Sequence, residues 1–402
     1  VLLLVAAGSG FQCQGVFRRM HVPSLQPYFE TFGHAAAPHA GPVNRTAGAA
    51  IERALRSPVE APGRGILLMA PRAGFGKTHL LEQVRRGLAG SHEFLPLRPL
   101  DGRHVDPAAA IEDSLRCLTR TLPASGGLTH LDLHARHLFA RGLEPLVVSG
   151  EVPCQDREAA AEALRKRPVE TFDFHHPQAV TAHWTRENFE VLGPRLSLEV
   201  SRLTEGSLNQ TAFWIAALFR YAVASPENPA RTGRLLQTAA DGADAERFGS
   251  LLALLSRLRR TVVVVDELEG VHGDPDGARR VAGFLATIRQ EAPRVDLIVS
   301  VNEDVWESSF VSALSGGLRD RLSELRVRLE PLDDAGIMAL LSGRGIADPQ
   351  RILSRLRLSP DERYARRVLQ AASDAIAGDP GLVSPPREAG AGHGQGESPG
   401  TG

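Results

Sequence analysis

The chain has 402 residues, 43% of them hydrophobic, so it can bury a large core and form more than one lobe. Its 46 basic and 47 acidic residues give a formal net charge of −1, with no overall bias toward nucleic acid or an anionic membrane. Cys13, Cys117 and Cys154 lie far apart without a C-x-x-C spacing, which argues against a disulfide framework and favours a reducing cytoplasm. No apolar run approaches the roughly 20 residues that cross a bilayer, so we expect no membrane segment.

The first 43 residues are predicted to form an N-terminal segment ahead of the folded core. Residues 1–19 contain a short apolar run with no basic residue before it, which makes a poor signal peptide. Met20 follows directly, so we expect translation to start there and residues 1–19 not to be translated. The expected location of the protein is the cytoplasm.

Residues 44–122 are predicted to be the first part of an α/β core. The sequence "NRTAGAAIERALRSP" (44–58) predicts a helix with Asn44 or Thr46 as its cap. The apolar run "GILLMA" (65–70) is typical of a strand buried on both faces of a parallel sheet. The elements expected next are a helix over 78–88, a strand over 93–102 and a helix over 106–122.

Residues 123–248 are predicted to be a largely helical insertion, because helical patches are broken by proline and glycine and no strand–helix alternation is present. His130, His134 and His137 share a helical face and could offer nitrogens to a metal. No further ligands can be placed, so we interpret them as ordinary histidines. The aromatic residues of "FWIAALFRY" (213–221) favour a buried helix over a base-stacking or partner surface.

Residues 249–332 are predicted to complete the core, because the alternation returns there. The expected elements are a helix over 250–260, a strand over 261–271, a helix over 274–292 and a strand over 295–304. Helices over 333–377 are expected to form a small lid, and the low-complexity residues 378–402 a disordered tail. The predicted fold is therefore a three-layer α/β structure with a parallel sheet, a helical insertion and a C-terminal helical lid.

The stretch "APRAGFGKTHLL" (70–81) ends like the phosphate-binding pattern G-x-x-x-x-G-K-[ST], with Pro71 in place of the first glycine. A strand, a glycine-rich turn and a helix supply backbone amides and a helix N-terminus for phosphates. Lys77 would reach the β- and γ-phosphate oxygens, and Thr78 would offer a hydroxyl to Mg²⁺. The chain contains only one other lysine, Lys166, and uses arginine at its other basic positions. A lysine at position 77 therefore favours a phosphate-binding role, in which lysine and arginine are not interchangeable. The residues predicted to bind nucleotide are Pro71, Arg72, Ala73, Gly74, Phe75, Gly76, Lys77, Thr78 and His79.

Four valines, 262–265, predict a buried strand that ends in Asp266 and Glu267. Two carboxylates at a sheet edge are costly without a cation, so we expect Asp266 to hold Mg²⁺ with Thr78. Glu267 would then orient and deprotonate the attacking water. Asn302 follows the next apolar strand and could help to position that water, although an asparagine also forms turns.

Several arginines are candidates for stabilising charge in the transition state. Arg319 or Arg321 could reach the γ-phosphate of a neighbouring subunit, and Arg366 or Arg367 could fold back from the lid. In a chain whose basic residues are almost all arginine, a solvated or ion-paired role remains the alternative for each of them.

In this order, the motifs resemble those of the AAA+ ATPases, a superfamily of P-loop NTPases. The sequence "GFGKTHLL" is most similar to the replication-initiator and helicase-loader branch, and the Asp-Glu strand and the lid also suit the origin-recognition and STAND branches. The resemblance covers roughly 44–120 and 249–377. It implies that Lys77 and Thr78 belong to Walker A, Asp266 and Glu267 to Walker B, and Asn302 to sensor 1. It likewise implies an arginine finger at Arg319 or Arg321 and a sensor 2 at Arg366, with Arg367 as the alternative.

Three departures from the family pattern limit what the resemblance implies. Pro71 replaces a glycine, and Lys77 and Asp266 are separated by an inserted segment that matches no family we can name. No winged-helix or helix-turn-helix module follows the lid, which weakens any expectation of sequence-specific DNA binding.

We therefore expect an ATP-binding and ATP-hydrolysing protein that uses Mg²⁺ and acts as a homo-oligomer. Its ATPase cycle would drive a DNA-associated remodeller or loader. The alternative is a STAND-like switch with slow turnover that acts through a protein partner. A scaffold with structural nucleotide is a third reading, which the Asp266–Glu267 pair argues against.

Overall fold

The computed structural model describes residues 32, 40–122 and 125–379. The predicted start at Met20 lies outside these residues, as does most of the predicted tail. The last described helix continues to Gly378, so the first residue assigned to that tail is helical.

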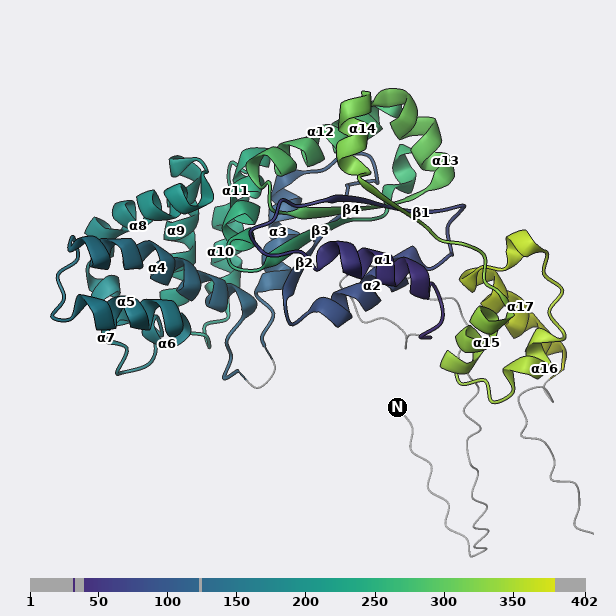
Figure 1. Cartoon of the computed structure of the whole chain (residues 1–402), viewed down its shortest axis with the longest axis horizontal. Coiled ribbons are helices and arrows are strands. Elements are labelled where there is room, and N and C mark those ends of the chain that lie inside the picture. The colour runs from purple at the N-terminus through teal and green to yellow at the C-terminus, as the bar shows by residue number, and fades with distance from the viewer. Residues whose placement is uncertain (1–31, 33–39, 123–124, 380–402) are drawn as a thin grey trace, which may run out of the picture.

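Five parallel strands form one sheet in the order β2-β3-β4-β1-β5, which confirms the predicted α/β fold (Figure 1). The strands are β1 (Gly65–Ala70), β2 (His92–Leu97), β3 (Arg260–Val265), β4 (Asp296–Asn302) and β5 (Leu325–Arg328). β4 ends slightly early, at Asn302 rather than at 304, and two strands end well before the expected residue: β2 at Leu97 rather than at 102, and β3 at Val265 rather than at 271. At both places the chain turns away into polar loops at the carboxyl edge of the sheet.

Helices cover both faces of the sheet and complete three layers. Because side chains alternate along a strand, Ile66 and Leu68 of β1 face one layer and Leu67 faces the other. The first layer contains α1 (Arg45–Leu55) and α2 (Lys77–Leu88). The second contains α3 (Pro107–Leu118), α11 (Ala245–Ser256), α12 (Pro275–Glu291) and α14 (Gly316–Leu322). Asp106 caps α3 by accepting from the Ala108 amide at 3.2 Å.

Between α3 and α11 the chain forms a separate group of helices at one end of the sheet (Figure 1). These are α4 (His130–Ser149), α5 (Arg157–Lys166), α6 (Pro168–Thr171), α7 (Val180–Glu187), α8 (Phe189–Thr204), α9 (Leu208–Val223) and α10 (Ala230–Ala240). Trp214 and Tyr221 of α9 are buried, while Phe213 and Phe219 are half-buried against the same core, as expected for a core helix. The segment is helical, as the sequence predicts.

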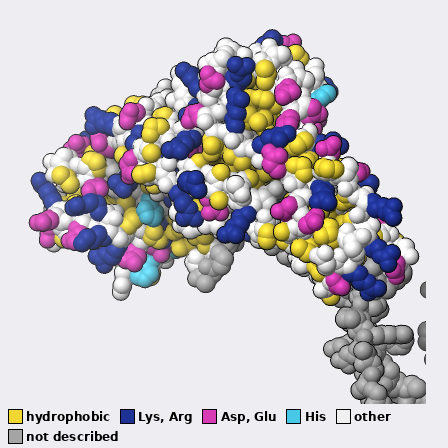
Figure 2. Space-filling model, turned by 45° about the vertical axis from the view of Figure 1, so that its right-hand side comes forward, with side chains coloured by type: hydrophobic (Ala, Val, Ile, Leu, Met, Phe, Trp, Pro, Cys, Tyr) yellow, Lys and Arg dark blue, Asp and Glu magenta, His cyan; other side chains and the backbone are white. Residues whose placement is uncertain are grey.

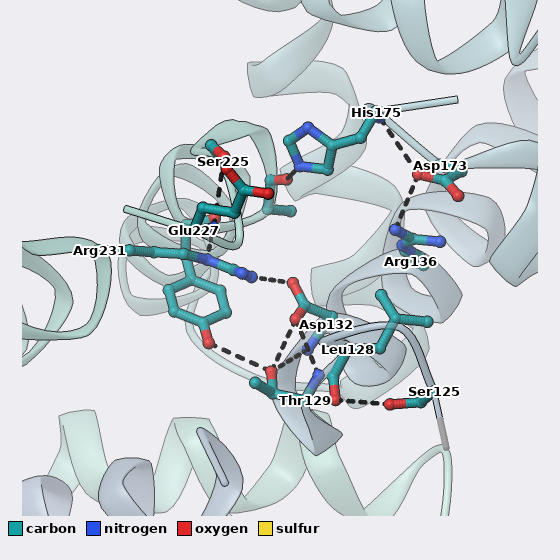
Figure 3. A network of polar contacts seen from close by, with 12 residues as sticks. Ser125, Leu128, Thr129, Asp132, Arg136, Asp173, His175, Ser225, Glu227 and Arg231 are labelled. Carbon is teal, nitrogen blue, oxygen red and sulfur yellow. Dashed lines mark hydrogen bonds and ion pairs between the residues drawn. The ribbon is translucent and has the colours of Figure 1, made fainter. Parts of the chain in front are cut away.

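A buried ion pair fastens α4 to α10 (Figure 3). Arg231 donates to Asp132, and its guanidinium lies 3.7 Å from the centre of the Tyr221 ring. The other carboxylate oxygen of Asp132 accepts from the Thr129 amide at 3.0 Å and the Thr129 hydroxyl at 2.8 Å. A buried charge pair is tolerated when its hydrogen bonds are satisfied in this way, and the network fixes how these helices meet.

The histidines of α4 are used in hydrogen bonds. His130 Nδ1 lies 3.2 Å and His134 Nε2 3.5 Å from Oε2 of Glu93 on β2. His137 Nδ1 lies 2.7 Å from the carbonyl oxygen of Leu133 in its own helix. Two of the three therefore connect the helical insertion to the sheet, and the third faces another direction.

The C-terminal helices α15 (Asp334–Gly343), α16 (Pro349–Leu353) and α17 (Ala365–Gly378) have a small core of their own (Figure 1). Ala40 and Val43 pack into this core from the segment before α1. Asp333 caps α15 by accepting from the Gly336 amide at 2.7 Å. Among the described residues, no helix is long and apolar enough to span a membrane.

Candidate active site

Residues 71–76, the predicted phosphate-binding loop (called the phosphate loop below), connect β1 to α2 at the carboxyl edge of the sheet. Gly74 and Gly76 have φ angles of 97° and 93°, in the left-handed region that favours glycine. Helix α2 begins at Lys77, directly after Gly76, so its first amides open onto the loop. Pro71, Arg72 and Ala73 form the entry of the loop, and Thr78 and His79 lie in the first turn of α2.

Thr78 and Asp266 meet across this edge although 188 positions separate them in the sequence. The Thr78 hydroxyl donates to Oδ2 of Asp266 at 2.6 Å. Asp266 follows β3 directly and is 7% exposed. A hydroxyl and a carboxylate in contact at the end of a phosphate loop are oxygen donors of the kind that Mg²⁺ prefers.

Lys77 is 7% exposed and donates from Nζ to Oδ1 of Asn302 at 2.6 Å. Asn302 is the last residue of β4, the strand between β1 and β3. Burial lowers the pKa of Lys77, and the negative charges of Asp266 and Glu269 oppose this effect. The sequence therefore identified three side chains, on separate segments, that the fold brings together with Thr78.

Glu267 lies beside this group in an unusual backbone conformation. Its φ and ψ angles are 64° and 43°, the left-handed region that residues other than glycine seldom adopt. Its side chain is exposed, whereas Asp266 before it and Leu268 after it are buried. Strained residues of this kind cluster at functional sites, and the strain must be held by the surrounding structure.

The C-terminal lid contacts the phosphate loop directly. The Arg366 amide donates to the Gly74 carbonyl at 3.1 Å, and its positive charge contributes to lowering the pKa of Lys77. The Tyr364 ring stacks on Phe75, with ring centres 5.0 Å apart. Arg367 lies 3.2 Å from Glu362 within the lid. Of the two lid arginines considered, Arg366 is thus the one at the loop.

Two contacts at the loop were missed by reasoning from the sequence. Asn44 stands at the N-cap position of α1 but makes no capping hydrogen bond through its side chain. The side-chain amide of Asn44 instead donates to the Phe75 carbonyl at 3.1 Å. Tyr364 precedes Arg366 by two positions, and no motif distinguishes it. The aromatic Phe75 within the loop is the one sequence feature that indicates an apolar partner.

Arg319 and Arg321 lie away from the phosphate loop of their own chain. Both belong to α14, and the backbone of Arg321 closely approaches Gly65 at the amino end of β1. The loop follows Ala70 at the other end of this strand, roughly 17 Å away at about 3.3 Å per residue. Within one chain the fold does not bring these arginines to Lys77.

Comparisons with known proteins give little further information. No protein-family model matches the chain, and no curated protein matches it. A solved structure that does match is the ORC1 protein of Aeropyrum pernix in complex with DNA, at 15% sequence identity and a TM-score of 0.36. The match covers 85% of this chain and 61% of that one, so this chain spans about three fifths of the length of that protein. A similarity of this size carries no argument about function, which must come from the site.

Proposed function

We propose that this chain binds ATP with Mg²⁺ and hydrolyses the terminal phosphoanhydride bond. The contact between Thr78 and Asp266 carries the proposal, because a glycine-rich sequence by itself also occurs at strand–helix turns that bind no phosphate. Two oxygen donors from distant segments, 2.6 Å apart beside a buried lysine, fit a site for a divalent cation and a triphosphate.

Each residue of the site has a distinct role in this proposal. The loop amides between Pro71 and Thr78 and the ammonium of Lys77 bind the phosphates. Thr78 and Asp266 hold Mg²⁺, which neutralises charge on the phosphate oxygens when it is bound. Glu267 accepts the proton of the attacking water.

Asn302 links the resting site to the loaded one. Its Oδ1 accepts from Lys77, which keeps the buried ammonium hydrogen-bonded. Triphosphate oxygens would take over as partners of Lys77 and release the amide to orient the attacking water. Arg366, whose amide already bonds to the loop, would add positive charge from the lid.

We further propose that two copies of the chain complete the site. Arg319 and Arg321 are too far from Lys77 of their own chain, so a contribution to catalysis requires a neighbouring subunit. Arg321 is exposed and Arg319 is half-buried, and such side chains can extend across an interface between copies.

Steady-state ATP turnover by the purified protein tests this function, with Glu267→Gln as the blank. Turnover that needs Mg²⁺ and disappears in the variant supports it. Absence of turnover, together with absence of ATP binding, would refute it.

The partner of the ATPase cycle is a separate question, with DNA and protein as the two candidates. Exposed aliphatic side chains favour a protein: of the seven large hydrophobic residues exposed in the described part of the chain, five belong to the insertion. These five are Val148, Val180, Val191, Leu198 and Leu208. Basic and acidic side chains are interspersed over the face shown in Figure 2, which is not the broad basic surface that a DNA duplex selects.

Turnover measured with and without duplex DNA distinguishes the two candidates. Stimulation by DNA favours a DNA-associated remodeller or loader. Slow turnover that is indifferent to DNA favours a switch that acts through a protein bound to residues 123–248.

A further inference from the structure

Two loops leave the sheet side by side at its carboxyl edge. One is the loop Leu100–His104 after β2, and the other is the turn Glu267–Val271 after β3. They start together because Leu97 of β2 pairs with Val265 of β3 in the parallel register. The second of them contains the candidate base, Glu267.

The two loops touch through two glycines, backbone against backbone. A Cβ atom on Gly102 would lie 2.8 Å from the Gly270 nitrogen and 3.1 Å from the Glu267 carbonyl oxygen. A Cβ atom on Gly270 would lie 2.1 Å from the Asp101 carbonyl oxygen. Gly102 also has a φ of 65°, so its conformation itself favours glycine. Neither position has room for a side chain.

A side-chain hydrogen bond strengthens the contact. Arg103 donates from Nε to the Gly270 carbonyl at 3.1 Å, while its backbone amide donates to Leu100 within its own loop at 2.9 Å. The loop Leu100–His104 is itself closed by the Leu100 amide, which donates to the His104 carbonyl at 2.7 Å. A compact loop therefore packs directly against the turn in which Glu267 adopts its left-handed conformation.

We propose that this contact positions Glu267 for catalysis, with Gly102, Gly270 and Arg103 as positioning residues. The inference rests on the proposed ATPase function. It goes beyond that function because none of the three residues is in the phosphate loop or follows a motif. The backbone strain at Glu267 needs support from neighbouring structure, and the Gly102–Gly270 contact supplies it.

The same contact connects the base to the helical insertion. Helix α3 begins at Pro107, three residues after the loop, and packs against α10 of the insertion.

Gly102→Ala and Gly270→Ala test the proposal. Ordinary contact begins at 3.4 Å, so the added methyl of Gly270→Ala would force the loops apart by roughly 1 Å. Because a misplacement of about 1 Å can cost on the order of 10²-fold in rate, kcat for ATP hydrolysis should fall by about that factor in both variants. The Kd for a fluorescent ATP analogue should stay at the wild-type value, since the phosphate loop is intact. Gly283→Ala is the matched control, because a Cβ there meets nothing within 4 Å.

Arg103→Ala provides a second test that does not depend on a tolerated backbone shift. Arg103 is exposed, so the variant should fold, and loss of one hydrogen bond should lower kcat roughly fivefold with Kd unchanged. Arg141→Ala, an exposed arginine of α4, is its control. Wild-type kcat in Arg103→Ala and in every glycine variant that folds, or a loss of ATP affinity that parallels the loss of rate, overturns the positioning role. A wild-type protein that binds ATP without hydrolysing it would instead refute the proposed ATPase activity. The two failures are therefore distinguishable.

Discussion

Lys77 shows how a single side chain can carry the chemistry of a site. Its ammonium is desolvated, which lowers its pKa, and it rests on a neutral amide oxygen of Asn302 rather than on a carboxylate. A buried cation with only partial compensation is costly to the fold, and an incoming polyanion relieves that cost. Such a lysine suits the phosphate binding that we propose for it.

Replacing Lys77 by alanine should therefore weaken ATP binding strongly. Removing a charge-assisted contact to phosphate costs roughly 1.5–3 kcal/mol, so we expect Kd to rise on the order of 10²-fold, measured by equilibrium titration with a fluorescent ATP analogue. Lys166→Ala is a natural control, since the only other lysine is exposed and paired with Glu162 on α5. An unchanged affinity in Lys77→Ala would remove the phosphate loop from the proposal.

Glu267 and Glu269 are two nearby carboxylates that mutation can separate. Glu267→Gln should bind ATP with wild-type affinity yet lose turnover by a factor of roughly 10²–10⁴, as expected when a general base is removed. Glu269 influences the charge balance of Lys77, so Glu269→Gln should alter affinity more than kcat. The assignment of the base is wrong if the single-turnover rate constant for hydrolysis falls sharply in Glu269→Gln and not in Glu267→Gln.

At the scale of residues, the sequence predicted the atoms that follow a local pattern. Asp266 stands directly after an apolar strand and Asn302 ends another, while Lys77 and Thr78 follow a third strand through the glycine-rich loop. Parallel strands bring their carboxyl ends to one edge. Asn44 and Tyr364 could not be predicted, because each meets Phe75 only through the packing of another segment against the loop. The fit between Gly102 and Gly270 is likewise invisible in a sequence that contains 39 glycines.

Among the elements, α14 has the least obvious purpose for the chemistry of one chain. It spans Gly316–Leu322 and ends beside the amino end of β1, where Arg289 donates to the Arg321 carbonyl at 3.2 Å. Its arginines therefore matter to hydrolysis only if copies of the chain assemble so that α14 of one copy faces the phosphate loop of the next.

Arg319→Ala and Arg321→Ala should then lower turnover without weakening ATP binding. An arginine supplied by a neighbour is worth about 10³–10⁵ in kcat in P-loop enzymes, and we expect at least one of these variants to show a loss approaching that range. A mixing experiment makes the test sharper. Arg319→Ala/Arg321→Ala chains have intact loops, and Lys77→Ala chains have intact arginines, so an equimolar mixture should recover part of the activity that each lacks alone. No recovery, with both variants folded, would contradict a contribution between subunits.

The type and order of the elements could be read from the sequence better than their ends. Apolar runs predicted the strands, but β2 and β3 stop where Arg98 and Asp266 begin polar loops, because ladder pairing ends there. The helical nature of residues 123–248 was predictable from its periodicity. The contacts by which α4 joins the sheet were not, since they depend on Glu93 lying opposite two histidines.

On the scale of the whole molecule, the buried carboxylate of Glu93 connects the insertion to the sheet. Burial raises the pKa of Glu93, but hydrogen bonds from His130 and His134 outweigh burial and bring the pKa to about 2. Burial lowers the pKa of His134, so the imidazole is protonated less readily in the folded protein than in the unfolded chain. Each of the two groups makes folding depend on pH.

Both effects should destabilise the protein in acid. Below pH 6.5 the unfolded chain protonates His134 more readily than the folded chain does, and below pH 4.5 the same holds for Glu93. The free energy of unfolding should therefore fall as the pH is lowered from 6.5. The Glu93 share, on the order of 3 kcal/mol at most, should be lost between pH 4.5 and about 2.

Urea unfolding across this pH range measures the effect. Glu93→Gln should flatten the curve below pH 4.5, whereas Glu162→Gln, an exposed carboxylate on α5, should leave it unchanged. Identical curves for the wild type and Glu93→Gln would show that the connection between β2 and α4 carries no such linkage.

The chain enters and leaves the insertion through helices of a single layer, since α3 and α11 pack against each other on the same face of the sheet. Everything between them can therefore change in length and content while the five strands keep their order. This part of the chain is therefore a place where one inserted domain could be replaced by another. An unrelated binding domain spliced between α3 and α11 would be connected through α3 to the loop Leu100–His104, which contacts the turn of Glu267, so that a different partner could then act on the site.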